Sequence, residues 1–227
     1  MSSENQTKPL RRTQSERSEA MRQRLIDATI ECLARDGYAG TTISTIIAQA
    51  DVSRGAPIHH FPTKASLIEA SASYLIQRLY VLLGKAVRSL EASDDRLQDM
   101  ILASWRQLFN RMEHDAMMEL MLASRRDAEL AGVMRQLWVA GRDVLDKASE
   151  HYFEALNDDV EISHLFILTH WLMGGMAMEH HLMDGDHVVE HFLKLWTTLL
   201  AGHIRSRPDV TSPPPRPANW KRLVGES

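Results

Sequence analysis

Histidines in the C-terminal half of the chain are the residues whose type and spacing could bind a metal ion. His187 and His191 stand four positions apart, so a helix would place both imidazoles on one face, and His180-His181 precede them. Zinc sites use this spacing, but the sequence offers no HExxH motif and no cysteine near these residues. We therefore interpret the histidines as surface or interface residues and predict neither a metal nor a cofactor.

Catalytic groupings are also missing from the sequence. There is no nucleophile elbow, no Walker loop and no glycine-rich dinucleotide fingerprint, and no serine or aspartate stands in a recognisable group with a base. The single cysteine, Cys32, excludes an internal disulfide and is interpreted as a small buried apolar residue of a helix. We predict that the protein is not an enzyme.

The segment 42–64, TISTIIAQADVSRGAPIHHFPTK, has the pattern of a helix-turn-helix. A first helix is expected over 42–50, because its apolar residues share one face, and Asp51-Val52 form the turn. Ser53 is a natural N-cap for a second helix that runs to His60. Two short helices joined in this way can place the second helix in a DNA major groove.

The flanking residues supply the rest of a small helical head. Upstream, Leu25, Ile26 and Leu33 fall on one helical face, and Gly37 is placed to end that helix. Downstream, Pro62 breaks the chain and Thr63 caps a fourth helix that is expected to reach about Leu90. This fourth helix is long enough to leave the head and enter the remainder of the chain.

Residues 24–70 resemble the DNA-binding domain of the TetR family of bacterial transcriptional regulators. The resemblance rests on Ala28, Gly37-Tyr38, Thr41-Thr42, Ile46, Ala50, Val52-Ser53, Gly55, His59-His60-Phe61, Lys64 and Leu67. It implies a dimer that forms through the last two long helices and a body that binds a small-molecule effector.

Four residues depart from the family pattern. Ile47 replaces a small residue, and Asp51 replaces the glycine of the turn, although aspartate tolerates a left-handed backbone better than most residues. Pro57-Ile58 stand where the family often has Leu-Tyr, and Ile58 cannot donate the tyrosine hydroxyl that commonly reaches a phosphate.

The expected DNA contacts follow from these positions. Gly55 lets the backbone approach the duplex, Ala56 can touch a thymine methyl, and Arg54 and His59 are expected at base edges or phosphates. Thr42 and Lys64 are expected at phosphates beside helix N-termini. The complete predicted set is Thr42, Ser44, Ser53, Arg54, Gly55, Ala56, His59, His60 and Lys64.

Composition predicts an all-α fold, and the charged residues are distributed unevenly along the chain. The 227 residues carry a net charge of −4, but residues 1–66 hold nine basic against seven acidic side chains. A mildly basic head on an acidic body fits a DNA-binding domain attached to a domain with another role. No run reaches the roughly 18 apolar residues of a membrane span, so no membrane contact and a cytoplasmic location are expected.

About nine helices are expected in four regions. These are a disordered arm over 1–15, the helix-turn-helix head over 16–66, a ligand-binding and dimerisation body over 67–206 and a Pro-rich tail over 207–227. The helices of the body are predicted at 94–112, 114–126, 128–156, 160–183 and 187–206.

Two sets of body residues are candidates for binding. Methionine and aromatic side chains adapt to irregular apolar ligands, and the candidate cavity set is Trp105, Phe109, Met121, Trp138, Phe166, His170 and Met173. The last two helices carry apolar residues on more than one side, so each should bury two faces. The candidate dimer set is Phe166, Met173, Phe192, Leu195, Trp196 and Leu199.

Together these patterns predict a homodimeric regulator that binds a palindromic operator in double-stranded DNA and is released by a small, largely apolar molecule. A repressor is the favoured reading. Two alternatives stay open: an activator or ligand-independent regulator of the same fold, and a helical small-molecule-binding protein without DNA binding.

Overall fold

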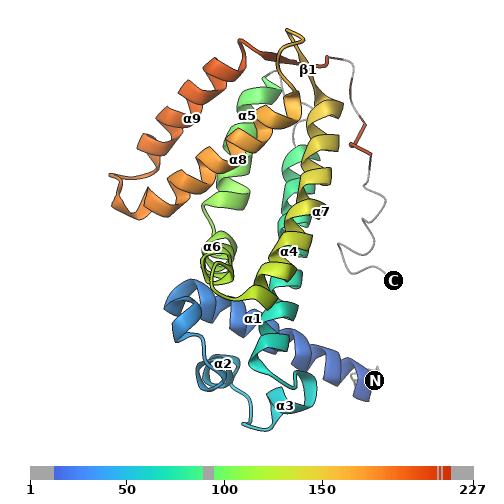
Figure 1. The fold of residues 1–227 in the computed structure, drawn as a ribbon, viewed down its shortest axis with the longest axis vertical. Coiled ribbons are helices and arrows are strands. Elements are labelled where there is room, and N and C mark those ends of the chain that lie inside the picture. The colour runs from blue at the N-terminus through green and yellow to red at the C-terminus, as the bar shows by residue number, and fades with distance from the viewer. Residues whose placement is uncertain (1–12, 89–94, 209, 211, 216–227) are drawn as a thin grey trace, which may run out of the picture.

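The computed structural model describes residues 13–88, 95–208, 210 and 212–215. Within these ranges the chain is almost entirely helical, which confirms the predicted all-α fold (Figure 1). The head contains α1 (Gln14–Gly40), α2 (Ile43–Ala50) and α3 (Ala56–His60), and α4 (Lys64–Arg88) leads from it into the body. The body contains α5 (Arg96–Ser104), α6 (Met112–Ser124), α7 (Ala128–Tyr152), α8 (Ile162–Glu179) and α9 (Asp186–Leu200).

The first helix begins at Gln14, with Thr13 as its N-cap, and Gly37 interrupts it near its end. Gly37 has φ 71° and ψ 174°, a backbone conformation that glycine adopts at little cost. The helix therefore breaks where the sequence predicts, although three further residues follow before Thr41. The hydroxyl of Thr41 donates to the carbonyl oxygen of Gly37 at 2.8 Å and fixes this break.

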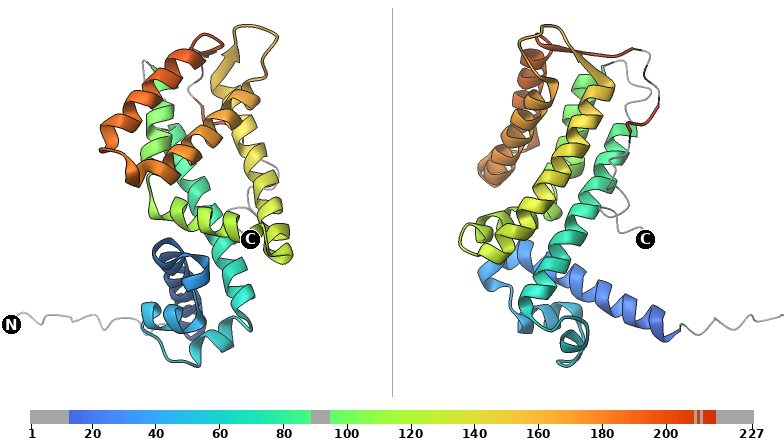
Figure 2. Two further views of the ribbon diagram at one scale, coloured as in Figure 1. Left: turned by 60° about the vertical axis from the view of Figure 1, so that its left-hand side comes forward. Right: turned by 45° about the vertical axis from the view of Figure 1, so that its right-hand side comes forward.

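The fourth helix starts where the sequence predicts and joins head to body (Figure 2). The backbone N–H of Ser66 donates to the Thr63 hydroxyl at 3.0 Å, and the Thr63 N–H donates to the Ser66 hydroxyl at 3.2 Å. These reciprocal bonds satisfy N–H groups of the first turn. The predicted end at Leu90 lies outside the described residues.

Two apolar clusters hold the structure together. The first joins the head to α4 and α6, because Leu25 and Leu33 of α1 pack in the same cluster as Leu75 of α4 and Leu120 of α6. The second lies in the upper body, among α5, α7, α8 and α9, and contains Trp105, Tyr152, Phe166, Met173 and Leu193 among its members. The head therefore shares its core with α6.

The predicted helix over 94–112 is interrupted. Its regular part ends at Ser104, and residues Trp105–Phe109 form a π-helical turn, η1, in which one extra residue is accommodated. Asn110 then leaves helical geometry with φ −88° and ψ 60°, and α6 begins at Met112, two residues earlier than predicted. Trp105 and Phe109, the first and last residues of this turn, are both buried.

A two-stranded antiparallel sheet replaces two helix ends that the sequence predicted. β1 (Phe153–Ala155) follows α7, and β2 (Ile204–Ser206) follows α9, with Phe153 opposite Ser206. The pairing is extended at both ends by backbone bonds from Leu156 to His203 and from Arg207 to Tyr152, each 2.8 Å. The helix α8 also ends early, at Glu179, and passes into a short 3-10 turn, η2 (His180–Leu182).

None of the helices in the described ranges is long and apolar enough to span a bilayer. Of the predicted arm, residues 1–12 lie outside the described part of the chain, as does most of the predicted Pro-rich tail.

Candidate DNA interface and effector cavity

The helix-turn-helix is built by local capping and one left-handed residue. The Thr42 side chain accepts from the N–H of Thr45 at 3.2 Å, and the Thr45 hydroxyl accepts from the N–H of Thr42 at 2.8 Å. Asp51 then takes φ 49° and ψ 56°, the left-handed conformation that the sequence predicts for this turn. The chain can therefore reverse after α2 without glycine.

The second helix of the motif is shorter than predicted. Ser53 does not cap it: α3 begins at Ala56, and Gly55 is its N-cap. The carbonyl oxygen of Ser53 accepts from the N–H of Ala56 at 3.1 Å, so residues 53–56 form a turn before the helix. Pro57 stands in the first helical turn, where a missing N–H costs least.

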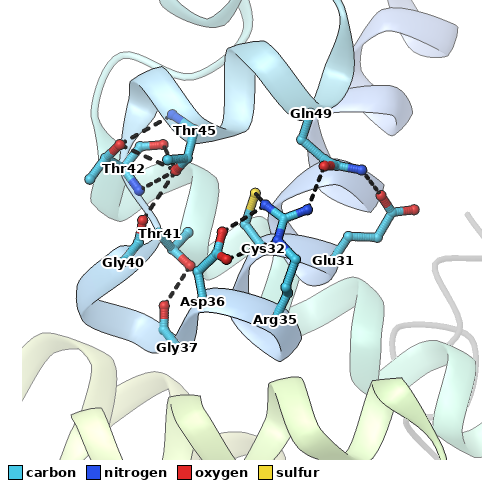
Figure 3. Close-up of polar contacts among 10 residues, drawn as sticks. All are labelled: Glu31, Cys32, Arg35, Asp36, Gly37, Gly40, Thr41, Thr42, Thr45 and Gln49. Carbon is cyan, nitrogen blue, oxygen red and sulfur yellow. Dashed lines mark hydrogen bonds and ion pairs between the residues drawn. The ribbon is translucent and has the colours of Figure 1, made fainter.

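A polar network holds α2 on α1 (Figure 3). The Arg35 guanidinium donates to the Gln49 side chain at 2.7 Å and to the Asp36 carboxylate at 2.7 Å. Gln49 in turn donates to the Glu31 carboxylate at 2.5 Å. The network lies beside Cys32, whose thiol pKa is raised by burial, so Cys32 is a packed apolar residue as predicted.

The predicted DNA-contact residues lie on the accessible side of this motif. Thr42, Ser44, Ser53, Arg54, Gly55 and His59 are exposed, and Ala56, His60 and Lys64 are half-buried. The Lys64 ammonium stands 4.9 Å from the centre of the Tyr38 ring, and the Arg22 guanidinium stands 5.1 Å from the centre of the Phe61 ring. Both cations are thus held close to the motif by aromatic faces.

A cavity of about 390 Å³ lies where the head meets the body, between α1, η1, α6 and the end of α8. Its residues are Ala34, Trp105, Phe109, Asn110, Arg111, His114, Asp115, Met118, Glu119, Leu122, Ala177, Met178, His180 and His181. Its position beside α1 matters, because a molecule bound there would touch the helix that carries the DNA-binding motif.

Only two of the predicted cavity residues, Trp105 and Phe109, line this space. The ring centres of His170 and Phe109 are 5.4 Å apart, and those of Trp138 and His170 are 5.8 Å apart. Phe166 and Met173 are buried in the upper core, and Met121 is 40 % exposed. Two of the seven predicted residues therefore line the cavity, and the other five do not.

Sequence reasoning missed the polar wall of the cavity, which α6 supplies. His114, Asp115 and Glu119 all lie on that helix. Burial, with a smaller contribution from nearby His170, lowers the pKa of His114 to about 4. Partial desolvation raises the pKa of Asp115, although the residue as a whole is exposed. The available signal was the sequence MEHDAMME, in which ionisable residues interrupt an otherwise apolar helix.

One residue of this wall also holds the DNA-binding head. The Glu119 carboxylate accepts from the backbone N–H of Tyr38 at 2.9 Å, just after the break at Gly37. The Tyr38 hydroxyl donates to Asp127, the N-cap of α7, at 3.4 Å. Tyr38 is therefore attached to two body helices by its backbone and its side chain.

The predicted dimer residues divide between the core and the surface. Phe192, Leu195 and Leu199 of α9 are half-exposed along one face, together with Leu168 and Trp171 of α8. Trp196 is partly buried, and its indole N–H donates to the Thr169 hydroxyl at 2.9 Å. Phe166 and Met173 are buried within this chain and are replaced on the exposed face of α8 by Leu168 and Trp171.

The histidine pairs do not assemble a metal site in the described part of the chain. No group of three or more histidine, cysteine or acidic side chains stands close enough there to hold an ion. His187 and His191 are exposed, and His180 is bonded to Asp186 at 2.7 Å.

Comparison with known proteins finds relatives of the head region. Residues 25–71 match the family model described as bacterial regulatory proteins, tetR family. The regulator CymR of Pseudomonas putida is 35 % identical over 128 residues, which cover 56 % of this chain and 63 % of CymR. Residues 25–71 therefore resemble the tetR family of bacterial regulatory proteins, and CymR, the relative by sequence named above, is a transcriptional regulator.

Solved structures share the fold over most of the chain. A transcriptional regulator from Rhodococcus sp. Rha1 superposes with a TM-score of 0.66 at 21 % identity, covering 80 % of this chain and 97 % of that one. A regulator from Saccharomonospora viridis, in complex with choline, gives 0.62 at 16 % identity, covering 83 % and 99 %. By sequence, the matched segments span 59–64 % of the length of the curated relatives.

Proposed function

We propose that this chain is a dimeric transcriptional repressor that binds a palindromic operator and is released by a small molecule. The observation that carries the proposal is the head itself. It has tetR-family sequence over residues 25–71, a helix-turn-helix, and exposed polar and basic side chains on the accessible side of that motif. In such an arrangement α3 enters the major groove, while residues around it contact phosphates.

The dimer is supported by the apolar face of α8 and α9. Trp171 and Leu199 are 58 % and 56 % exposed, and Phe192 and Leu195 are each 50 % exposed. Large apolar side chains clustered on one surface favour association with another surface of the same kind. A two-fold dimer through this face presents two heads, and two heads require two operator half-sites.

The effector role is supported by the cavity beside α1. A molecule bound there contacts α6 and Ala34 of α1 at once, and the Saccharomonospora viridis neighbour holds choline. Release follows if the effector binds better to the conformation whose two heads no longer match successive major grooves.

Binding to the DNA that flanks the protein's own gene tests this function. We expect fluorescence anisotropy to show tight binding that weakens steeply as salt rises, because phosphate contacts release counterions. We expect a footprint with two-fold symmetry and half-sites about one helical turn, or a multiple, apart. A footprint that overlaps the promoter identifies repression, and one upstream of it identifies activation. An affinity that does not change with salt would contradict the proposal.

A further inference from the structure

The charge of the cavity wall is not balanced by its own residues. Asp115 and Glu119 stand four positions apart on α6, so their carboxylates share one face of that helix. No ion pair among the described residues includes either one. Arg111 also lines the cavity, but its guanidinium is bonded to Glu113 at 3.1 Å, a carboxylate that also binds Arg78 at 2.7 Å. The side chains leave a net negative charge at this wall.

The cavity wall also contains two nitrogen atoms that lack partners. The indole N–H of Trp105 and Nε2 of His114 are buried, and no hydrogen bond to either atom is formed by the described residues. Trp105 is 1 % exposed and His114 is 5 % exposed. A buried donor without a partner costs about 1–3 kcal/mol, so a bound acceptor that reaches the indole N–H of Trp105 would gain a hydrogen bond. Nε2 of the neutral His114 ring donates or accepts according to its tautomer.

The remaining walls are aromatic. Phe109 and Trp105 both line the space, and the Phe109 ring centre stands 5.0 Å from that of His114. Aromatic faces attract cations as well as apolar groups, and this attraction strengthens where water is excluded. The cavity therefore favours a ligand with three properties. The carboxylates favour a positive charge, the aromatic faces favour a flat or apolar shape, and the unpaired indole N–H favours a hydrogen-bond acceptor.

We propose that the cavity binds a small organic cation that also carries a hydrogen-bond acceptor. Its ammonium group pairs with the carboxylates of Asp115 and Glu119, and its acceptor receives the indole N–H of Trp105. This ligand class differs from the largely apolar effector that the sequence predicted, because the acidic wall of α6 becomes visible only when α6 is placed against η1 and η2.

The same contacts connect the ligand to the head, a step that rests on the proposed function. The Glu119 carboxylate that faces the cation is the acceptor for the Tyr38 N–H. An ammonium ion competes with that N–H for the same oxygen atoms and weakens the attachment of the head to α6. A neutral or anionic molecule does not compete with the Tyr38 N–H for the Glu119 carboxylate.

Three molecules that share one carbon skeleton but differ in charge test whether the cavity prefers a cation. They are 2-amino-1-phenylethanol, a cation with a hydroxyl acceptor, the neutral 1-phenylethane-1,2-diol and the anion mandelate. We expect calorimetry on the full chain at neutral pH to show that the amine binds at least tenfold more tightly than either analogue. Tighter or equal binding of mandelate, or no binding of the amine at millimolar concentration, would overturn the proposal.

Two variants locate the contacts. Asp115→Asn should weaken binding of the amine about tenfold, whereas the exposed control Glu150→Gln on α7 should leave it unchanged. Trp105→Phe should weaken binding of 2-amino-1-phenylethanol by roughly three- to tenfold but not that of 2-phenylethylamine, which has no acceptor. Equal losses for both amines would remove the acceptor from the proposal, and an unchanged affinity in Asp115→Asn would remove the acidic site.

DNA binding without any added molecule is measured in parallel. A protein that selects the amine but binds no DNA refutes the proposed function and leaves the ligand class standing. A protein that binds DNA but prefers mandelate refutes the ligand class alone. With the amine bound, the Tyr38 amide proton should exchange faster with solvent, and an unchanged exchange rate would refute the competition at Glu119.

Discussion

The Glu119 carboxylate lies against the glycine that breaks α1 and binds the N–H of the next residue, Tyr38. A Cβ atom added at Gly37 would stand 3.0 Å from Glu119 Oε2, a tight contact, and the positive φ at this position favours glycine. The contact joins α6 of the body to the short link that precedes α2. Displacing one carboxylate therefore changes the restraint on the whole helix-turn-helix.

Lys64 should contribute affinity without sequence preference. Its ammonium stands over the Tyr38 ring at the start of α4, where a phosphate contact carries no base information. We expect Lys64→Ala to weaken binding to all DNA sequences equally and to reduce the salt slope by about one. Anisotropy titrations at several salt concentrations measure this slope, and Lys85→Ala, far along α4, is the matched control. A variant with an unchanged slope would exclude the phosphate contact.

Arg54 and His59 should determine which bases are accepted. Both are exposed, and they lie before and within α3, the helix expected in the major groove. A side chain that contacts a base edge contributes about 1–3 kcal/mol of discrimination, so Arg54→Ala or His59→Ala should relax particular operator positions. Selection from randomised sites reads out the change. If wild type and both variants select one consensus, these residues do not read bases.

A charge on the apolar face of α9 should prevent dimerisation. Leu195→Glu places a carboxylate where a partner would have to bury it, which is costly without a counter-ion. Light scattering should then report monomers, whereas Lys194→Glu, exposed on the same helix, should remain dimeric. Leu195 is a better choice than Trp196, because Trp196 is bonded to Thr169 within the chain. A dimeric Leu195→Glu protein would move the interface to another surface.

Stability should fall in mild acid because of His114. Burial lowers its pKa to about 4 in the folded chain, below the ordinary value of 6.5, so the unfolded chain binds the proton more readily. The stabilisation is complete above pH 6.5 and is lost as the pH falls toward 4, by about 3 kcal/mol for this group. Burial lowers the pKa of His170 in the same direction.

Urea titrations at several pH values measure this dependence. His114→Phe should flatten the curve between pH 6.5 and 4. An exposed histidine supplies the control: His203→Phe should leave the slope unchanged. A slope that persists in His114→Phe would assign the acid sensitivity to other groups.

The turn after α2 should tolerate only residues that adopt a left-handed backbone at low cost. Asp51 has a left-handed backbone, which β-branched residues adopt only at a cost. We expect Asp51→Val to lower the free energy of unfolding by about 1–2 kcal/mol. Asp51→Asn should be nearly neutral, since asparagine also adopts this conformation. Urea unfolding compares the two variants, and equal stabilities would show that the turn relaxes to another conformation.

The sequence predicted those parts of the fold that depend on neighbouring residues. The break at Gly37, the turn at Asp51 and the cap at Thr63 are local features, and each is present in the structure. The N-cap of α3 was assigned to Ser53 although Gly55 has that position, because several residues of this turn can begin a helix. Helix boundaries of this kind depend on backbone geometry that residue types do not fix.

The missed parts depend on residues far apart in the chain. The strands after α7 and α9 are only three residues long, and their pairing joins Phe153 to Ser206 across the whole of α8 and α9. Trp105 and Phe109 could be assigned to the cavity from their type, but His114 and Glu119 could not. Their role depends on how α6 crosses α1 and η1, which no periodicity within α6 encodes.

The small sheet has a consequence for protein engineering. Because β1 and β2 pair side by side, the segment from Phe153 to Ser206 leaves and re-enters the body at one place. A segment whose ends are adjacent can be exchanged as a cassette without altering the path of the chain on either side. Helices α8 and α9 from another regulator could be grafted at this sheet, provided that their inner faces fit α7 and α5. Such a graft would pair this head with a different choice of partner, and it would also replace the part of the cavity wall that α8 and η2 supply.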